Sequence, residues 1–325
     1  MIGKRLKYAQ RYQEILTALL KNGLGFIVKD LGLLGFKRKA EADSTMYSKS
    51  IAERIRSVLE ELGPTFVKLG QLASTRVDLI PENIIKELEK LQDNVAPIPF
   101  SDVEKIIEKE LGQPANDLFL EVNDRPIASA SIGQVHYGKL PTGQEVAIKV
   151  QRPNIEEKID IDLQILSDLT NLMEEKLEWA NNYRISEIVE EVSRSLRLEL
   201  DYTVEAWNGE KIARQLKEHP NYIIPSIHWE YTTKRILTMD YISGTRLRDY
   251  AKNASEAEKK LVAKQFVECM FQQIFIDGFF HGDPHPGNLF VLPDKRMALI
   301  DFGMIGRLSP SMKNDLASVI IALKN

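Results

Sequence analysis

The chain has a single cysteine, Cys269, among 325 residues, so no disulfide can form within it. Cys269 lies in an apolar stretch with helical character, where a thiol is usually buried and inert. No apolar run near the N-terminus reaches the ~20 residues of a membrane span. The five histidines lack the spacing of zinc ligands, and the net charge of −4 argues against nucleic-acid binding. These absences fit a globular protein of a reducing, cytoplasmic setting.

Positive charge is concentrated at the start of the chain. Residues 1–40 contain nine Lys or Arg and two acidic residues, although the whole chain carries −4. Short apolar runs alternate with these charges. Two interpretations stay open: a basic amphipathic arm that lies on an anionic membrane surface, or an ordinary helix pair packed on the main body with its lysines in water.

The spacing of apolar residues divides the chain into four segments. After the basic arm at 1–43, a helical extension is predicted over 44–122, with a break at Gly63-Pro64. Residues 123–242 contain strands on both sides of a helical insertion, and residues 243–325 contain a long helix followed by two short strands. This order predicts an α+β fold with two lobes.

The strongest chemical signal is a loop in the last segment that begins H-G-D at His281. Asn288 follows Asp283 by five residues, and Asp301, which begins a D-F-G sequence, follows Asn288 by thirteen. Phosphoryl-transfer sites use this order: Asp283 would face the attacking hydroxyl or water, and Asn288 and Asp301 would hold Mg²⁺ through oxygen. A strand hairpin with its turn at 293–295 would fix the separation of the two metal ligands. His281 is expected to shape the loop rather than to move protons.

A lysine on an apolar strand supplies the other half of such a site. Lys149 ends the sequence V-A-I-K, and a buried lysine needs an anion beside it. In kinases the equivalent lysine binds the α- and β-phosphates and pairs with a helix glutamate. Glu199 is the predicted partner, with Asp201 and Glu205 as further acids nearby. Lys149, Glu199 and Asp283 are therefore the predicted catalytic residues.

The segment before this strand departs from the usual phosphate loop. Such loops favour glycine because their backbone N–H groups must approach the phosphates, whereas two of the positions are alanine here. Alanine stiffens the loop. The residues predicted to contact ATP are Ala128, Ser129, Ala130, Ser131 and Gly133 in this loop, Lys149, and Met239 and Tyr241 at the connection between the lobes.

Together these residues resemble the UbiB/AarF family of atypical kinase-like proteins, over about residues 44–306. The feature that separates this family from ordinary kinases is its K-x-G-Q motif, here Lys68 to Gln71, which continues to Pro81. The alanine-rich loop, the E-x-D that starts at Glu199 and the H-G-D loop are similar to the family as well. The resemblance implies a kinase-like fold in which Lys68 and Gln71 reach the nucleotide pocket and their helix covers the peptide-substrate entrance.

The resemblance also implies ATP and Mg²⁺ as cofactors, with kinase or ATPase activity in isoprenoid quinone or related membrane-lipid metabolism. A lipid or quinone precursor would be the partner, with peripheral contact at the inner face of the cell membrane through residues 1–40. Two alternatives stay open: a small-molecule kinase of the aminoglycoside or choline phosphotransferase type, which lacks the K-x-G-Q motif, and a nucleotide-binding pseudokinase scaffold. Because 22 residues follow Gly303, the C-terminal lobe is expected to be truncated.

Overall fold

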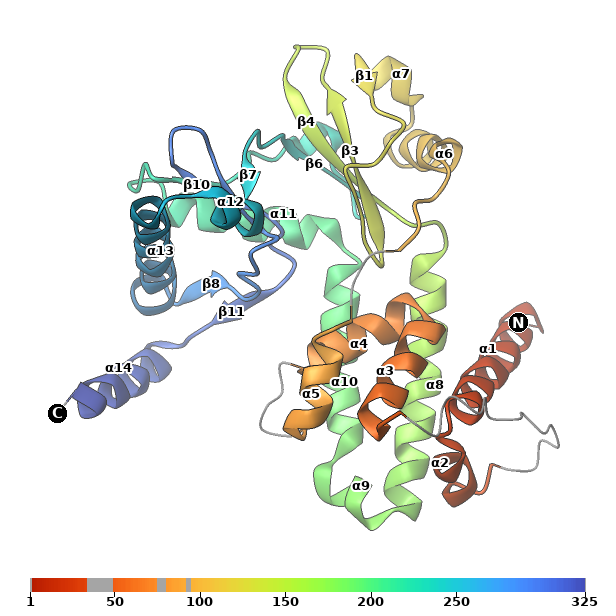
Figure 1. The fold of residues 1–325 in the computed structure, drawn as a ribbon. Coiled ribbons are helices and arrows are strands. Elements are labelled where there is room, and N and C mark those ends of the chain that lie inside the picture. Colours follow the sequence, from red (N-terminus) through yellow and green to blue (C-terminus); the bar gives the residue numbers. More distant parts are fainter. Residues whose placement is uncertain (1, 34–48, 75–79, 92–94, 325) are drawn as a thin grey trace. The chain divides into compact units, whose positions relative to one another are not determined.

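The computed structural model describes residues 2–33, 49–74, 80–91 and 95–324. The chain forms two compact units (Figure 1). The first comprises residues 1–98, 128–134 and 151–197, and the second comprises residues 99–127, 135–150 and 198–325. The units divide the chain differently from the four predicted segments, because the helices inserted after Lys149 belong with the N-terminal helices.

The first unit is mainly helical. Its elements are α1 (Ile2–Lys21), α2 (Gly25–Asp30), α3 (Ile51–Leu62), α4 (Pro64–Ser74), α5 (Glu82–Leu88), the short strand β2 (Ala128–Ser129), α8 (Ile155–Lys176), α9 (Glu178–Tyr183) and most of α10 (Ile185–Glu199). Gly63, at φ +89°, separates α3 from α4 at the predicted break. The predicted start of this helical extension, residues 44–48, lies outside the described residues. The helix itself begins at Ile51, where Ser50 and Glu53 form a capping box.

The apolar side of α1 packs inside the first unit. Ile15 and Ala18 are buried against Val58 of α3 and Ile165 of α8. Of the two interpretations of the basic arm, the described residues 2–33 therefore match the packed helix pair, while residues 34–43 lie outside the described part. No helix among the described residues is long and apolar enough to cross a bilayer.

The second unit contains three sheets and the helices that cover them. Its elements are α6 (Phe100–Leu111), α7 (Ala115–Leu118), β1 (Glu121–Val122), most of β3 (Gly133–Lys139), β4 (Glu145–Gln151), α11 (Tyr202–Gln215), β5 (Tyr222–Ile223), the 3₁₀ helix η2 (Trp229–Tyr231), β6 (Ile236–Asp240), β7 (Thr245–Arg246), α12 (Leu247–Asn253), α13 (Glu256–Phe271), the π-helix η3 (Gln272–Asp277), β8 (Phe279–His281), β9 (Leu289–Val291), β10 (Met297–Leu299), β11 (Ile305–Arg307) and α14 (Pro310–Lys324).

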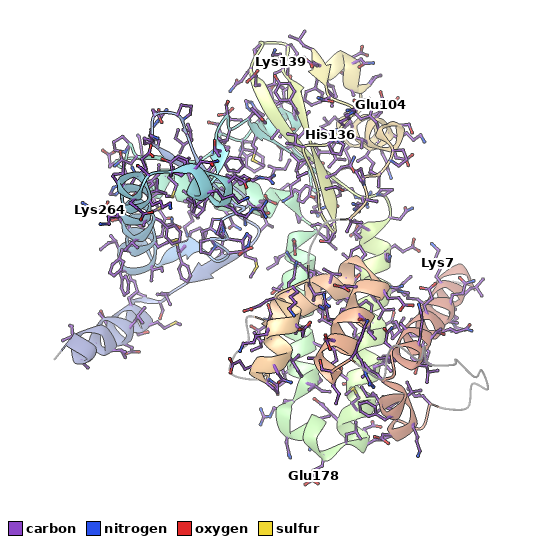
Figure 2. All side chains as sticks on the ribbon, in the orientation of Figure 1. Lys7, Glu104, His136, Lys139, Glu178 and Lys264 are labelled. Atoms are coloured by element: carbon purple, nitrogen blue, oxygen red, sulfur yellow. The ribbon has the colours of Figure 1, made fainter. Side chains whose placement is uncertain are left out.

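One sheet has the order β1-β3-β4-β6, with β2 paired to β3. Alternate residues of β4, such as Val146 and Ile148, are fully buried, which is the pattern of a strand with one face on a core. His136 of β3, which is labelled in Figure 2, packs its ring on Phe100 of α6, with the ring centroids 5.6 Å apart. The sheet therefore holds Lys149 of β4 in a rigid setting, in register with Leu237 of β6.

A second sheet, β5-β10-β9-β7, contains the predicted hairpin. β9 and β10 pair antiparallel, with Leu289 opposite Leu299. Both residues are buried in a core shared with Phe279 and Phe302. The hairpin thus places Asn288 and Asp301, which flank these strands, at the same end of the sheet.

Candidate active site

Lys149 forms a buried ion pair with Glu205 of α11. Its Nζ lies 2.8 Å from Oε2 and 3.0 Å from Oε1 of Glu205, so one ammonium group donates to both oxygens. The side chains are 14% and 6% exposed. Beneath the ammonium lies the Tyr202 ring, with its centroid 5.0 Å from Nζ, a cation–π distance. A strand lysine and a helix glutamate therefore meet as the kinase pattern requires.

The predicted pair of Lys149 with Glu199 is wrong, because Glu205 occupies that position. Glu199 ends α10, and Asp201 begins α11 as its N-cap by accepting a hydrogen bond from the Thr203 N–H. Glu205 lies one turn inside α11, on its buried face. Glu199 still acts on the site electrostatically, since its charge raises the pKa of Glu205.

A second carboxylate, that of Asp301, approaches the same lysine. Its Oδ1 lies 3.8 Å from Lys149 Nζ, and its side chain is 47% exposed. Burial lowers the pKa of Lys149, but Asp301 and Glu205 outweigh burial and hold that pKa well above its usual value, so the ammonium stays charged. Burial raises the pKa of Glu205 to about 7, and the charge of Asp301 adds to this, although Lys149 opposes it. One cation thus faces two carboxylates, an arrangement with room for a further cation.

Asp301 and Asn288 are fixed by the hairpin that the sequence predicts. The Ile300 N–H donates to Asn288 O at 3.0 Å and extends the β9–β10 ladder by one pair. Asp301 then turns away from the strand at φ +62°, a backbone strain typical of functional sites. Phe302 is buried and its carbonyl accepts from Asn208 Nδ2 at 3.0 Å. These contacts anchor Asp301 on both sides, and its side chain remains 47% exposed.

His281 joins the catalytic loop to the strand before Asp301. Its Nδ1 accepts from the Asp283 N–H at 3.1 Å, so Nε2 carries the proton and donates to Ile300 O at 3.0 Å. The ring is 1% exposed and serves as a brace, which confirms the expectation that it shapes the loop. Asp283 itself is exposed, with its carboxylate directed to solvent and its carbonyl held by Asn288 Nδ2 at 3.2 Å.

The oxygen donors of this site suit Mg²⁺. Asn288 uses its Nδ2 to hold the loop, so its Oδ1 and the exposed carboxylate of Asp301 are the oxygens that would bind the metal. Across the described ranges, no cluster of three or more His, Cys, Asp or Glu could hold a metal by itself. Two protein ligands fit Mg²⁺ that is completed by nucleotide phosphates and water, and not a protein-only metal cage.

Of the predicted adenine contacts, Met239 lies in β6 at the edge of the first sheet, and Tyr241 directly follows the end of that strand. Met239 is opposite Ala147 in β6, and the Tyr241 N–H donates to Glu145 O at 3.0 Å. That N–H is therefore used by strand pairing and is not free to bind adenine. The Tyr241 ring packs edge-on against Tyr137, 5.2 Å between centroids. A nucleotide contact at Met239 and Tyr241 stays a prediction, restricted to their other groups.

The alanine-rich loop is part of the first unit and is fastened by Arg152. The guanidinium donates to Ala130 O at 3.0 Å, to Ser129 Oγ at 2.9 Å and to Ala96 O at 3.0 Å. The Ala130 N–H donates to Gly133 O at 2.8 Å, and Ser131 is 1% exposed. The loop is thus a tight, bonded turn, and its contact with nucleotide stays a prediction.

The K-x-G-Q helix is α4, also in the first unit. A Cβ on Gly70 would lie 2.3 Å from a Leu91 methyl and 2.8 Å from a Leu59 methyl, so any larger residue would force these leucine side chains to move. Gln71 donates to Leu91 O at 3.3 Å. The glycine and glutamine therefore hold α4 against its neighbours, and the approach of Lys68 and Gln71 to the nucleotide stays a prediction. Residues 75–79, the continuation of the motif, lie outside the described residues.

Sequence reasoning gave Glu205 a minor role and missed Tyr202 and Arg152. One signal could have found Glu205: it stands four residues after Asp201, so an N-cap at Asp201 places it one turn into a new helix. The predicted residues that the structure brings together are Lys149 with Asp301, and Asp283 with Asn288.

Comparisons with known proteins show which family the chain belongs to. The family model described as ABC1 atypical kinase-like domain matches residues 90–325. The probable protein kinase UbiB of Marinobacter nauticus is 41% identical over 280 residues, which cover 84% of this chain and 51% of that protein. An uncharacterized protein of Synechocystis sp. is 36% identical over 324 residues, covering 96% of this chain and 77% of its own length. The chain thus spans about half the length of the UbiB relative.

A solved structure shows a similar fold. The complex of Rv3197 with erythromycin from Mycobacterium tuberculosis matches with a TM-score of 0.60 and 31% identity. The match covers 79% of this chain and 64% of that one.

Proposed function

Because the chain belongs to the ABC1 atypical kinase-like family, we propose that it binds a Mg-nucleotide at Lys149 and Asp301 and transfers the terminal phosphoryl group. The predicted UbiB/AarF membership and kinase-like fold are correct. The acceptor, the metal and the nucleotide are part of the proposal.

The observation that carries the proposal is the cluster of one lysine and two carboxylates. A buried ammonium that donates to Glu205 at 2.8 Å is preorganised toward the phosphates, because Glu205 fixes its position. Asp301 lies within 3.8 Å of the same ammonium but remains 47% exposed. An ion pair that served only stability would have no need of an exposed aspartate with a left-handed backbone beside it.

Each residue of the site has a separate role in the proposed phosphoryl transfer. Lys149 binds the α- and β-phosphate oxygens, and Asn288 and Asp301 hold the metal. Mg²⁺, when bound, neutralises the charge that develops on the phosphate oxygens. Asp283 accepts the proton of the attacking hydroxyl as the new P–O bond forms and the bond to the leaving diphosphate breaks. His281 and the Asn288 amide hold Asp283 in place during this step.

We assign the acceptor to isoprenoid quinone or related membrane-lipid metabolism, on the basis of the UbiB/AarF resemblance. Water as the acceptor would make the protein an ATPase, and the same residues would serve. Membrane contact, at the inner face of the cell membrane, is proposed through basic side chains of the first unit. The apolar side of α1 is already buried in that unit, so this contact would be electrostatic.

The test is nucleotide hydrolysis by the purified protein, with and without anionic vesicles and quinone-precursor-like phenols. Asp301→Asn is the matched variant, since it keeps the shape and removes the charge that holds the metal. We expect Mg-dependent hydrolysis in the wild type and a loss of roughly 100-fold or more in Asp301→Asn. Unchanged Mg-nucleotide affinity and rate in that variant would refute the proposed site. Nucleotide binding without turnover under every condition would favour the scaffold alternative.

A further inference from the structure

A chain of buried hydrogen bonds runs from α13 to the catalytic loop. Gln273 Nε2 donates to Cys269 Sγ at 3.1 Å, and Gln273 Oε1 accepts from the His281 N–H at 2.9 Å. All three residues are buried, with Gln273 at 0% exposure and Cys269 and His281 at 1%. Because His281 also braces Asp283 and Ile300, Gln273 is connected through a single residue to both halves of the candidate active site.

The backbone places Gln273 at this point by a local change of helix type. α13 becomes the π-helix η3 at Gln272, and η3 ends at Gly278 with φ +67°. A Cβ on Gly278 would lie 2.8 Å from Leu308 O, so the turn into β8 requires glycine. A π-helical turn inserts one residue into a helix and often marks a functional position. Here it leads the chain from Gln273 directly into the strand that carries His281.

The helix formed by α13 and η3 has one face buried in the second unit and an opposite face that is exposed. Lys264 projects outward from the helix (Figure 2) and is 73% exposed. Gln265, Cys269 and Gln273 follow at intervals of four residues and are all buried. In the described part of the chain, Gln265 Oε1 is buried without a hydrogen-bond partner, whereas both ends of the Gln273 amide are bonded. Of these two buried glutamines, Gln273 therefore has hydrogen-bond partners for both its amide oxygen and its amide nitrogen, whereas the amide oxygen of Gln265 has none.

We propose that Gln273 is a positioning residue for phosphoryl transfer: its carbonyl oxygen fixes the His281 backbone and thereby the position of Asp283. Gln273 contacts none of the reacting groups and acts through His281. Removal of its acceptor leaves the His281 N–H buried without a partner, a state that proteins avoid. Loss of this hydrogen bond should therefore displace the loop that carries Asp283. It should not displace Lys149, because β4 and α11 fix the position of that lysine. This inference rests on the proposed function for its kinetic part only.

The first measurement needs no activity. Hydrogen exchange of the peptide that covers 281–288 is compared with that of the β4 peptide 145–151 in the full chain. We expect Gln273→Leu to speed exchange at 281–288 at least about tenfold while the β4 peptide is unchanged, because one buried hydrogen bond of the loop is lost. Gln273→Met, which keeps the length of the side chain, serves if the leucine variant does not fold.

Two matched controls separate positioning from helix packing. Gln265→Leu removes a buried amide from the same face, and Cys269→Ala removes the other end of the hydrogen-bond chain while Gln273 keeps its bond to His281. Both should exchange like the wild type at 281–288. Faster exchange of both peptides in Gln273→Leu, or the same loop effect in Gln265→Leu or Cys269→Ala, would overturn the proposal, because each outcome indicates general destabilisation.

The second measurement uses nucleotide hydrolysis. Gln273→Leu should lower kcat roughly tenfold or more and leave KM for the nucleotide within about twofold, because base positioning and nucleotide binding are separate contributions. A KM effect without a kcat effect would contradict the assignment. If the wild type hydrolyses no nucleotide, the proposed function fails while the exchange experiment still decides whether Gln273 positions the loop.

Discussion

Each unit contains a buried ion pair, and the two pairs differ in how exposed the carboxylates around the cation are. In the first unit, Arg11 of α1 donates to Asp162 of α8 through Nε at 2.6 Å and a terminal nitrogen at 3.2 Å. The same guanidinium donates to Leu62 O at 2.6 Å and to Glu14 at 2.7 Å. Asp162 is fully buried. The Arg11–Asp162 pair is therefore closed, because the planar guanidinium of Arg11 donates hydrogen bonds to all the acceptors named above.

The Lys149 pair of the second unit is open by comparison. A lysine ammonium is a point charge, and here it is shared between Glu205 at 2.8 Å and Asp301 at 3.8 Å. Two carboxylates face one ammonium, and the side chain of Asp301 is exposed, so a positively charged ligand such as a metal ion can bind beside this pair. Burial of an ion pair therefore does not by itself identify a ligand-binding site. An accessible carboxylate beside the pair does.

The largest effect that tests this comparison should come from the closed pair. Arg11→Met leaves the Asp162 carboxylate buried without its partner, so we expect a loss of about 3–5 kcal/mol in the free energy of unfolding. Urea denaturation measures it. The double variant Arg11→Met/Asp162→Leu should recover most of the loss, since no lone charge remains. A loss below about 1 kcal/mol in the single variant would show that the pair is not closed.

The next effect concerns which glutamate holds Lys149. Glu205→Gln should reduce nucleotide hydrolysis roughly 100-fold, because Lys149 loses the carboxylate that fixes its position. Glu199→Gln, the matched control, should stay within about threefold of the wild type. The measurement is kcat/KM for the nucleotide in both variants. The opposite ranking would restore Glu199 as the partner.

A smaller effect follows from the pKa of Glu205. Since burial raises this pKa from 4.5 to about 7, the folded state binds the proton more tightly than the unfolded state. The stabilising contribution is therefore full below about pH 4.5 and is lost as the pH rises to about 7, on the order of 1 kcal/mol or more. Glu205→Gln should flatten this part of the stability profile. Parallel profiles for the wild type and Glu205→Gln over that range would contradict the raised pKa.

The smallest effect should come from an exposed pair on the same helix as Arg11. Lys7, which is labelled in Figure 2, lies 2.7 Å from Glu157, but the side chains of this pair are 56% and 46% exposed. Lys7→Met should change the free energy of unfolding by less than about 1 kcal/mol, and less still at high salt. Thermal unfolding at two salt concentrations measures it. If Lys7→Met lowered the free energy of unfolding as much as Arg11→Met, burial would not explain the difference between closed and exposed ion pairs.

Much of the site could be predicted from sequence because its parts are local. Asn288 and Asp301 flank a hairpin whose register follows from short apolar strands and a turn, and His281 lies two residues from the Asp283 it braces. The error at Glu199 has a different origin. The acid that meets Lys149 depends on where α10 ends and α11 begins, and the Asp201 cap that decides this is only one of several plausible helix starts.

The sequence by itself determined the family of this protein, through its strand lysine, its H-G-D loop and its K-x-G-Q motif, and it predicts two oxygen ligands for Mg²⁺. Only the tertiary structure decided which carboxylate fixes Lys149, how closely Gly70 packs on its neighbours, and how Gln273 reaches the catalytic loop. The physical reason is that residue type and short spacing specify local chemistry. Contacts between residues far apart in the chain depend on which faces of helices and strands the packed core turns toward each other.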